Sequence, residues 1–234
     1  MSRFVWCEDS RSGFVFWKTL FNTLYPDITL DSKGNNSELR KSVENLGNNS
    51  DQYYIIMDLA LDNPDVLREY KRLTKVISAK NNINLIKLHS FEYCLLSFKD
   101  LDDWIFAEED ELRDKRKNLM EARKLIVRII TEGASNDELI KLQTLLDVND
   151  LKNSEQTASK ILFELTRNTG FETDKSQIGP CFIVDCCNWK DKQNDDICGL
   201  NLSRLTLKEK MEQILKRSVL YSAFMEADLY DNCI

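Results

Sequence analysis

Short apolar runs alternate with amphipathic segments along residues 1–100 of the chain. Runs rich in β-branched and aromatic side chains predict strands, and they lie at residues 4–7, 28–30, 53–57 and 83–88. Helical spacing of apolar positions predicts helices between them, at residues 14–24, at residues 37–47 and from Pro64 onward, with Asn63 as its cap. Strands that alternate with helices favour a parallel sheet covered on both faces, so the predicted fold class is α/β.

The second part of the chain has a different pattern, because helical spacing replaces the short apolar runs. One long helix is predicted from Leu101 to about residue 131, and Gly133 ends it. Further helices are predicted at residues 136–147, 154–168 and 206–218. We therefore divide the chain into an α/β domain at residues 1–100 and a mainly helical region at residues 101–234, with a cysteine-rich insertion at residues 179–199.

Composition narrows the function classes. The net charge of −7 argues against a wholly basic nucleic-acid coat protein, and the lack of any uncharged apolar stretch of about 18 residues argues against a membrane span. The seven cysteines are odd in number, and no signal-peptide pattern precedes the first apolar run, so a reducing, cytoplasmic location is expected. A single histidine, His89, makes carboxylate or cysteine chemistry more plausible than histidine chemistry.

Acidic residues follow three of the predicted strands. Glu8 comes after the first strand, Asp58 after the third, and Asp62 lies four residues further on. Because ligands of parallel sheets gather at the carboxyl ends of the strands, these carboxylates predict a site for Mg²⁺ or Mn²⁺. Glu92 follows the fourth strand and is either a fourth metal ligand or a helix-start residue that interacts with the helix dipole. The structural alternative for all of them is an ordinary loop or cap residue.

Two of these segments resemble a known family. The run from Val5 to Phe16 resembles the opening of a Toprim domain, in which a strand ends in Glu and a helix follows. The segment Ile55-Ile56-Met57-Asp58-Leu59-Ala60 is similar to the second Toprim motif, a strand that ends in Asp-x-Asp, and Ser90-Phe91-Glu92-Tyr93 resembles an acidic position of Toprim nucleases related to the overcoming-lysogenization-defect type. The resemblance covers about residues 3–100 and implies a Toprim-like parallel sheet.

The resemblance also implies a function. Toprim nucleases use Mg²⁺ to cleave phosphodiester bonds in DNA or RNA, and many act in phage defence beside an ABC-type partner ATPase. Glu8 would then be the general acid/base or a metal ligand, and Asp58 the principal metal ligand. The chain departs from the motif at Ala60, where the second Asp is expected, and Asp62 is the nearest substitute. This departure favours an alternative, a non-catalytic Toprim-like scaffold that binds a partner protein.

A third hypothesis uses the same residues. Receiver domains place acidic residues after the first strand and a phosphorylatable Asp after the third, as Glu8, Asp9 and Asp58 would be, and Ser90 fits the hydroxyl after the fourth strand. A receiver also needs a fifth strand that ends in Lys. A helix is predicted after Leu96 instead, which makes this hypothesis the weakest of the three.

Two residues are candidates for substrate binding. Lys33 and the following Gly34 form a turn that leads into a helix N-terminus, a place where backbone N–H groups bind phosphate, although the P-loop spacing is absent. His89 follows the fourth strand and is a candidate phosphate contact or proton shuttle. The structural alternatives are a tight turn that needs glycine and a hydrogen-bonded histidine at the sheet edge.

Four cysteines lie close together in the sequence. Cys181, Cys186, Cys187 and Cys198 have the spacing C-x4-C-C-x10-C, and four thiols at this density suit a tetrahedral Zn²⁺ site. The spacing lacks a C-x2-C pair, and reduced cysteines are also common as small buried apolar residues. Zinc binding and simple core packing both remain open from the sequence.

Overall fold

The parallel sheet predicted from the sequence is confirmed. The computed structural model describes residues 1–47, 49–108, 110–188 and 198–230. Its strands are β1 (Arg3–Cys7), β2 (Ile28–Ser32), β3 (Gln52–Asp58) and β4 (Ile83–Leu88). They pair in the order β2-β1-β3-β4 and every pair is parallel, with Cys7 opposite Ile56. Glu8 and Asp58 therefore reach the same carboxyl edge of the sheet from neighbouring strands.

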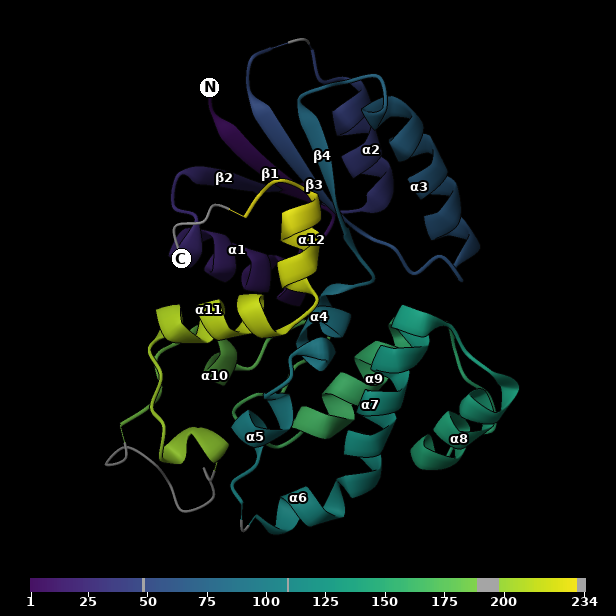
Figure 1. The fold of residues 1–234 in the computed structure, drawn as a ribbon, viewed down its shortest axis with the longest axis vertical. Helices are drawn as coiled ribbons and strands as arrows, with labels where there is room; N and C mark the ends of the chain where they lie inside the picture. The colour runs from purple at the N-terminus through teal and green to yellow at the C-terminus, as the bar shows by residue number, and fades with distance from the viewer. Residues whose placement is uncertain (48, 109, 189–197, 231–234) are drawn as a thin grey trace.

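Helices cover both faces of the sheet (Figure 1), as the strand–helix alternation predicts. Alternate side chains of a strand point to opposite faces, and β3 shows this directly. Ile55 and Met57 belong to the core beneath α2 (Asn36–Glu44) and α3 (Pro64–Ile77), whereas Ile56 belongs to the core beneath α1 (Ser12–Leu24). The continuous apolar run 53–57 is the expected signature of a strand buried on both faces.

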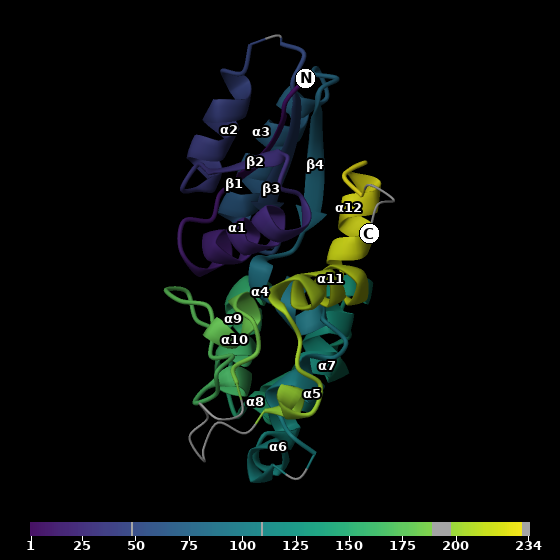
Figure 2. The ribbon, with the colours of Figure 1, turned by 90° about the vertical axis from the view of Figure 1, so that its left-hand side faces the viewer.

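The second part of the chain is mainly helical, as predicted. Its helices are α4 (Phe91–Ser97), α5 (Leu101–Ile105), α6 (Glu111–Lys115), α7 (Lys117–Glu132), α8 (Asn136–Leu146), α9 (Ser154–Thr166), α10 (Pro180–Ile183), the 3-10 helix η2 (Gly199–Asn201), α11 (Leu207–Arg217) and α12 (Leu220–Glu226). Figure 2 shows α5 to α9 at the opposite end of the molecule from the sheet. Within the described residues, no helix is both long and apolar enough to cross a bilayer.

The single long helix predicted from Leu101 to about residue 131 is wrong. The chain forms α5, α6 and α7 there instead. Asp110 starts α6 by accepting a hydrogen bond from the Leu112 amide at 2.8 Å, and Arg116 interrupts the helix just before α7. The buried Arg116 guanidinium donates to the Leu165 carbonyl at 2.7 Å. The interruption of the helix at Arg116 is therefore accompanied by a contact with α9. The spacing of apolar residues does not reveal such a contact between distant segments.

The C-terminal helices return to the sheet. Helix α11 packs on α1, and α12, which the sequence analysis did not predict, packs on β4. The Asn84 side chain donates to the Ala227 carbonyl at 2.8 Å, and the Phe224 ring stacks on Phe21 with centroids 5.8 Å apart. One continuous core thus extends from the α1 face of the sheet into the helices beyond residue 100. The division of the chain into two domains at residue 100 remains a prediction. Helices α11 and α12 belong to the second part of the chain but pack on the first.

Candidate functional site

Acidic side chains from several segments line a cleft at the carboxyl edge of the sheet. The cleft has a volume of about 370 Å³. Its carboxyl groups belong to Glu8, Asp9, Asp58, Glu92 and Glu155. Glu8, Asp58 and Glu155 also line an adjoining cleft of about 490 Å³. The structure therefore brings together three of the predicted residues, Glu8, Asp58 and Glu92.

Glu8 and Asp58 occupy the centre of this edge. The Asp58 backbone N–H donates to Glu8 Oε1 at 2.5 Å, which joins the ends of β1 and β3. Burial raises the pKa of Glu8 to about 8, the hydrogen bond from Asp58 opposes that shift, and the charges of Asp9 and Glu155 add to it. Burial also raises the pKa of Asp58 well above its ordinary value, and the neighbouring carboxylates reinforce the shift. Burial thus favours the protonated form of both groups, and a bound cation would favour the ionised form instead.

Asp9 lies over the N-terminus of α1, and Trp17 and Gly13 fix it there. Trp17 Nε1 donates to Asp9 Oδ2 at 2.7 Å. A Cβ atom on Gly13 would lie 2.2 Å from Asp9 Oδ1, so only glycine leaves room for this carboxylate. Burial raises the pKa of Asp9 to about 6, against the lowering effect of the Trp17 hydrogen bond. Gly13 at the start of α1 is thus needed to leave room for Asp9.

Glu92 fits both interpretations made from the sequence. It lies in the first turn of α4, where the helix dipole favours a carboxylate, and it also lines the acidic cleft. Its side chain is only 7% exposed. Burial raises its pKa to about 7, opposed by its own backbone N–H, while Asp9 raises it further.

Asp62 does not join this group of carboxyls. It is exposed, and its carboxylate accepts hydrogen bonds from Ser154 N at 2.6 Å and from Ser154 Oγ at 2.7 Å. His89 Nε2 also lies 2.7 Å from Ser154 Oγ, and burial lowers the pKa of His89 to about 4. Asp62 and His89 therefore hold the first residue of α9. Neither is among the residues that line the acidic clefts.

The contacts of Ser154 explain why Glu155, which the sequence analysis missed, lies in the acidic cleft. Glu155 follows Ser154 in the first turn of α9, and it faces the sheet edge because the start of α9 is held there. The helical region thus supplies one carboxyl of the cleft. The local sequence does not predict this position of Glu155. A Glu in the first turn is common in helices because it interacts favourably with the helix dipole.

Lys33 lies apart from the clefts. Its ammonium pairs with Asp31 and lies 4.1 Å from the centre of the Trp6 ring. The residues after it line the clefts instead, including Gly34 and Asn35. Substrate binding by Lys33 remains a prediction that its position does not favour.

Two other cations face the site and connect it to a larger cleft. Arg11 and Lys175 line both the acidic cleft and a neighbouring cleft of about 650 Å³. Lys175 Nζ lies 3.7 Å from Glu155 Oε1. The larger cleft has an apolar lining that includes Leu151 and Phe163, and its cations Lys152 and Lys160 stand against the carboxylates of Asp150 and Asp174. Cationic and apolar surface therefore adjoins the acidic group.

The donor chemistry of the acidic cleft suits a hard divalent cation. Mg²⁺ prefers oxygen ligands, retains several waters, and would cancel the repulsion among these carboxylates. Ala60, which is fully buried, supplies no carboxylate in place of the second Toprim Asp. Among the described residues, no three His, Cys, Asp or Glu side chains already form a ligand set for one ion. Mg²⁺ would therefore bind with few protein ligands and with rearrangement of the side chains.

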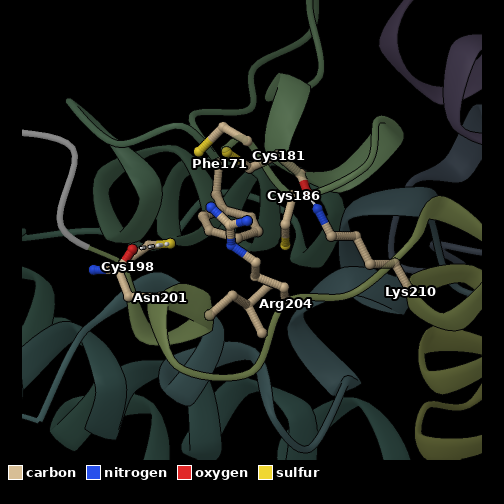
Figure 3. Close-up of a pocket in the computed structure, with 9 residues that line it drawn as sticks. Phe171, Cys181, Cys186, Cys198, Asn201, Arg204 and Lys210 are labelled. Atoms are coloured by element: carbon tan, nitrogen blue, oxygen red, sulfur yellow. Dashed lines mark hydrogen bonds between the residues drawn. The ribbon is translucent and has the colours of Figure 1, made fainter. Parts of the chain in front are cut away.

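The four cysteines proposed for zinc meet in a separate pocket. Cys181, Cys186, Cys187 and Cys198 all line it, together with Arg204 and Lys210 (Figure 3). Its volume is about 20 Å³. Cys181, Cys186 and Cys187 are free thiols in the structure, and Cys198 Sγ donates to Asn201 Oδ1 at 3.7 Å. The four cysteines thus line one pocket, but among the described residues no three of them already form a ligand set for one ion, so zinc binding stays a prediction.

Models of known protein families, curated proteins and solved structures were each compared with the chain, and none of them matched.

Proposed function

We propose that this protein is a Mg²⁺- or Mn²⁺-dependent nuclease that cleaves phosphodiester bonds in DNA or RNA. The observation that carries the proposal is the group of Glu8, Asp9, Asp58, Glu92 and Glu155 at the carboxyl edge of a parallel sheet. Buried carboxyls with raised pKa values are unfavourable for folding unless a cation or a proton neutralises them. Proteins concentrate such groups where function needs them.

Each residue has a chemical role in this proposal. Asp58 and Glu8 would hold the ion at the ends of β3 and β1, as the Toprim resemblance implies. A bound Mg²⁺ supplies charge stabilisation at the phosphoryl group and activates water for attack. Glu92, whose pKa is raised to about 7, is suited to exchange a proton at the leaving oxygen near neutral pH.

The neighbouring cleft supports a nucleic-acid substrate. Arg11 and Lys175 lie at the border of the acidic cleft, where phosphates on either side of the scissile bond would meet them. Phe163 and Leu151 offer apolar surface on which a base can rest, and stacking of this kind is tolerant of sequence. The chain as a whole has a net charge of −7, so its composition gives no sign of nucleic-acid binding. The two cations at the border of the acidic cleft are therefore the local feature that supports it.

A second candidate is the non-catalytic scaffold. Ala60 and the engagement of Asp62 by Ser154 favour it, because neither position then supplies the second Toprim carboxylate. The phage-defence role and the ABC-type partner ATPase rest on the Toprim resemblance alone, whichever candidate holds. The receiver hypothesis loses support, because the described residues contain a four-stranded sheet whose β4 edge is contacted by α12.

The test combines metal binding with cleavage assays. Mg²⁺ and Mn²⁺ are titrated calorimetrically into wild-type protein and Asp58→Asn, with Asp137→Asn on the exposed start of α8 as the matched control. Single- and double-stranded DNA and RNA are then incubated with each protein and each metal. We expect metal-dependent cleavage that Asp58→Asn abolishes and the control retains. Saturable metal binding without cleavage of any substrate would favour the scaffold, and no binding with no cleavage would contradict the nuclease proposal.

A further inference from the structure

Cysteine side chains from three chain segments converge away from the acidic cleft. Cys181 lies in α10, Cys186 and Cys187 follow that helix, and Cys198 immediately precedes η2. Figure 3 shows Cys198 and Cys186 on either side of the Arg204 guanidinium in this view, with Cys181 above and Lys210 to the right. The other described cysteines, Cys7 and Cys94, are fully buried in the main core. Convergence of four thiols from separate segments is more than core packing requires.

We propose that Cys181, Cys186, Cys187 and Cys198 bind one structural Zn²⁺ ion. This inference is independent of the nuclease proposal, since it concerns a different end of the chain and a different class of ligand.

The backbone around Cys181 is built to hold its thiol in place. A Cβ atom on Gly170 would lie 2.4 Å from Cys181 Sγ, so glycine makes the room that this sulfur occupies. The Cys181 amide donates to the Gly170 carbonyl at 2.9 Å. The ammonium of Lys210, a side chain only 1% exposed, donates to the carbonyls of Cys181 and Val184 at 2.8 and 2.9 Å.

The second thiol has a backbone donor of its own. The Leu205 N–H lies 3.4 Å from Cys186 Sγ, and the Cys186 N–H donates to the Leu205 carbonyl at 3.0 Å. Backbone N–H groups directed at sulfur stabilise the thiolate form and orient the ligand, as outer-shell contacts do in metal sites. Asp185 fixes the same turn by accepting from the Leu207 N–H at 2.6 Å.

Charge and ligand type both favour zinc. Four thiolates on one Zn²⁺ carry a net charge of −2, and Arg204 and Lys210 supply two positive charges at the same pocket. Among the described residues that line the pocket there is neither a carboxylate nor a histidine, and thiolate ligands favour Zn²⁺ over a hard cation such as Mg²⁺. Binding is balanced as one Zn²⁺ and four thiols giving the tetrathiolate and four released protons.

The size of the pocket fits a single ion. Its volume of about 20 Å³ is close to that of one water-sized site and excludes an organic ligand. Structural zinc sites are closed in this way, whereas catalytic ones keep an open position. The sulfur atoms do not yet form a ready ligand set among the described residues, so zinc must draw them inward. Metal-coupled ordering of this kind is usual for structural zinc.

The connection between α9 and α11 contains little regular structure among the described residues. Only the four-residue α10 and the three-residue η2 are helical there, and loop hydrogen bonds such as that from Phe182 N to the Gly179 carbonyl at 3.0 Å join other parts of it. An ion shared by Cys181, Cys186, Cys187 and Cys198 would tie its two halves together beneath α11.

The test measures metal content in the full-length protein purified under reducing conditions without chelator. We expect about one zinc per chain, and Co²⁺ substitution should give thiolate-to-cobalt charge transfer and tetrahedral d–d bands. Cys181→Ser and Cys198→Ser should lose most of the zinc, whereas Cys94→Ala, the matched control in the core, should keep it. Because the cobalt spectrum is recorded on wild-type protein, the test stands even if a variant misfolds.

Two outcomes would overturn the zinc site. One is wild-type protein that contains no zinc and, after reduction and incubation with Zn²⁺ or Co²⁺, still binds neither. The other is a disulfide among these cysteines, detected as fewer than seven reactive thiols in denatured, unreduced protein. Neither outcome affects the nuclease proposal, whose measurements depend on Mg²⁺ or Mn²⁺ and on Asp58.

Discussion

The acidic cleft and the cysteine pocket differ in almost every physical property. The acidic cleft is an open space of about 370 Å³ lined by carboxyls whose burial, reinforced by their mutual repulsion, raises their pKa values. The cysteine pocket is a closed space of about 20 Å³ with two cations beside its thiols. The first gathers carboxyl groups and has room for substrate, and the second gathers thiols and two cations and has room for one atom.

This difference separates two uses of a metal ion. An open cleft with few fixed ligands suits an ion that exchanges and meets a substrate phosphate, whereas a closed thiolate site suits an ion that stays bound and holds the chain. The experiments below test whether one region carries activity and the other carries stability. They are ordered from the largest expected effect to the smallest.

Glu8→Gln should separate activity from stability most clearly. It removes a proposed metal ligand, so we expect cleavage to fall by at least about 100-fold, the upper range known for perturbing metal-site contacts. The same change removes a buried carboxyl whose raised pKa disfavours folding above about pH 5, so near neutral pH the metal-free variant should melt at a higher temperature than metal-free wild type. Calorimetry and cleavage rates measure both effects, and Glu111→Gln on exposed α6 is the control. A variant that loses both activity and stability would indicate a structural role for Glu8.

Removal of zinc should have the opposite pattern. Structural zinc contributes folding free energy directly, and loss of several kcal/mol corresponds to a fall in Tm of about 10 °C or more for a chain of this size. A thiol-compatible zinc chelator should therefore lower Tm by this amount, whereas removal of Mg²⁺ at pH 6 should stop cleavage and lower Tm far less. Differential scanning calorimetry with each chelator measures the two changes in Tm. Equal loss of Tm with either treatment would contradict the division between the two regions.

Stability of the metal-free protein should depend on pH in a specific direction. In the folded protein the pKa of Glu8 is about 8 and that of Glu92 about 7, against an ordinary value of 4.5. Between about pH 5 and pH 8 the folded chain thus binds more protons than the unfolded chain, so the free energy of unfolding falls as pH rises. Melting curves across this window should show a falling Tm.

Two controls sharpen the pH prediction. Mg²⁺ at saturating concentration should flatten the fall, because the ion replaces the protons, and Glu8→Gln should reduce its slope. A Tm that rises from pH 5 to pH 8 in metal-free wild type would show that these carboxyls are ionised in the folded protein.

Much of the sheet could be predicted from the sequence, because local patterns encode it. The run 53–57 is apolar at every position, as a strand buried on both faces requires, and Asn63-Pro64 marks the start of α3. Glu8 and Asp58 could be paired in advance, since the parallel register brings the ends of neighbouring strands together. These conclusions need only short-range sequence and the topology rule for parallel sheets.

Other features depend on contacts between distant segments and could not be predicted locally. The break between α5 and α7 involves a buried Arg116 that reaches the α9 carbonyl of Leu165. Glu155 joins the acidic cleft only because Asp62 holds Ser154, an interaction across the two parts of the chain. Helix α12 was missed for the same reason, since its partner is β4.

Ser154→Ala tests whether the contact between α9 and the sheet positions Glu155. The change removes the hydroxyl bonded to Asp62 and His89, so we expect a loss of about 1 kcal/mol in stability. Displacement of Glu155 should also weaken Mg²⁺ binding and lower the cleavage rate by about tenfold. A structural effect alone would lower Tm and leave Mg²⁺ affinity unchanged. Ser154→Thr, which keeps the hydroxyl, should restore the affinity.

Lys175→Ala and Lys33→Ala provide the finest comparison. Lys175 faces the acidic cleft beside Glu155, so its loss should raise KM for nucleic acid several-fold and reduce the salt dependence of binding, as expected for one lost phosphate contact. Lys33 contacts Asp31 and the Trp6 ring instead, so its loss should change KM by less than about twofold. KM measured at two or more salt concentrations distinguishes the variants. The reverse order would show that substrate approaches over the β2 turn, as the sequence hypothesis for Lys33 requires, and not along the border formed by Arg11 and Lys175.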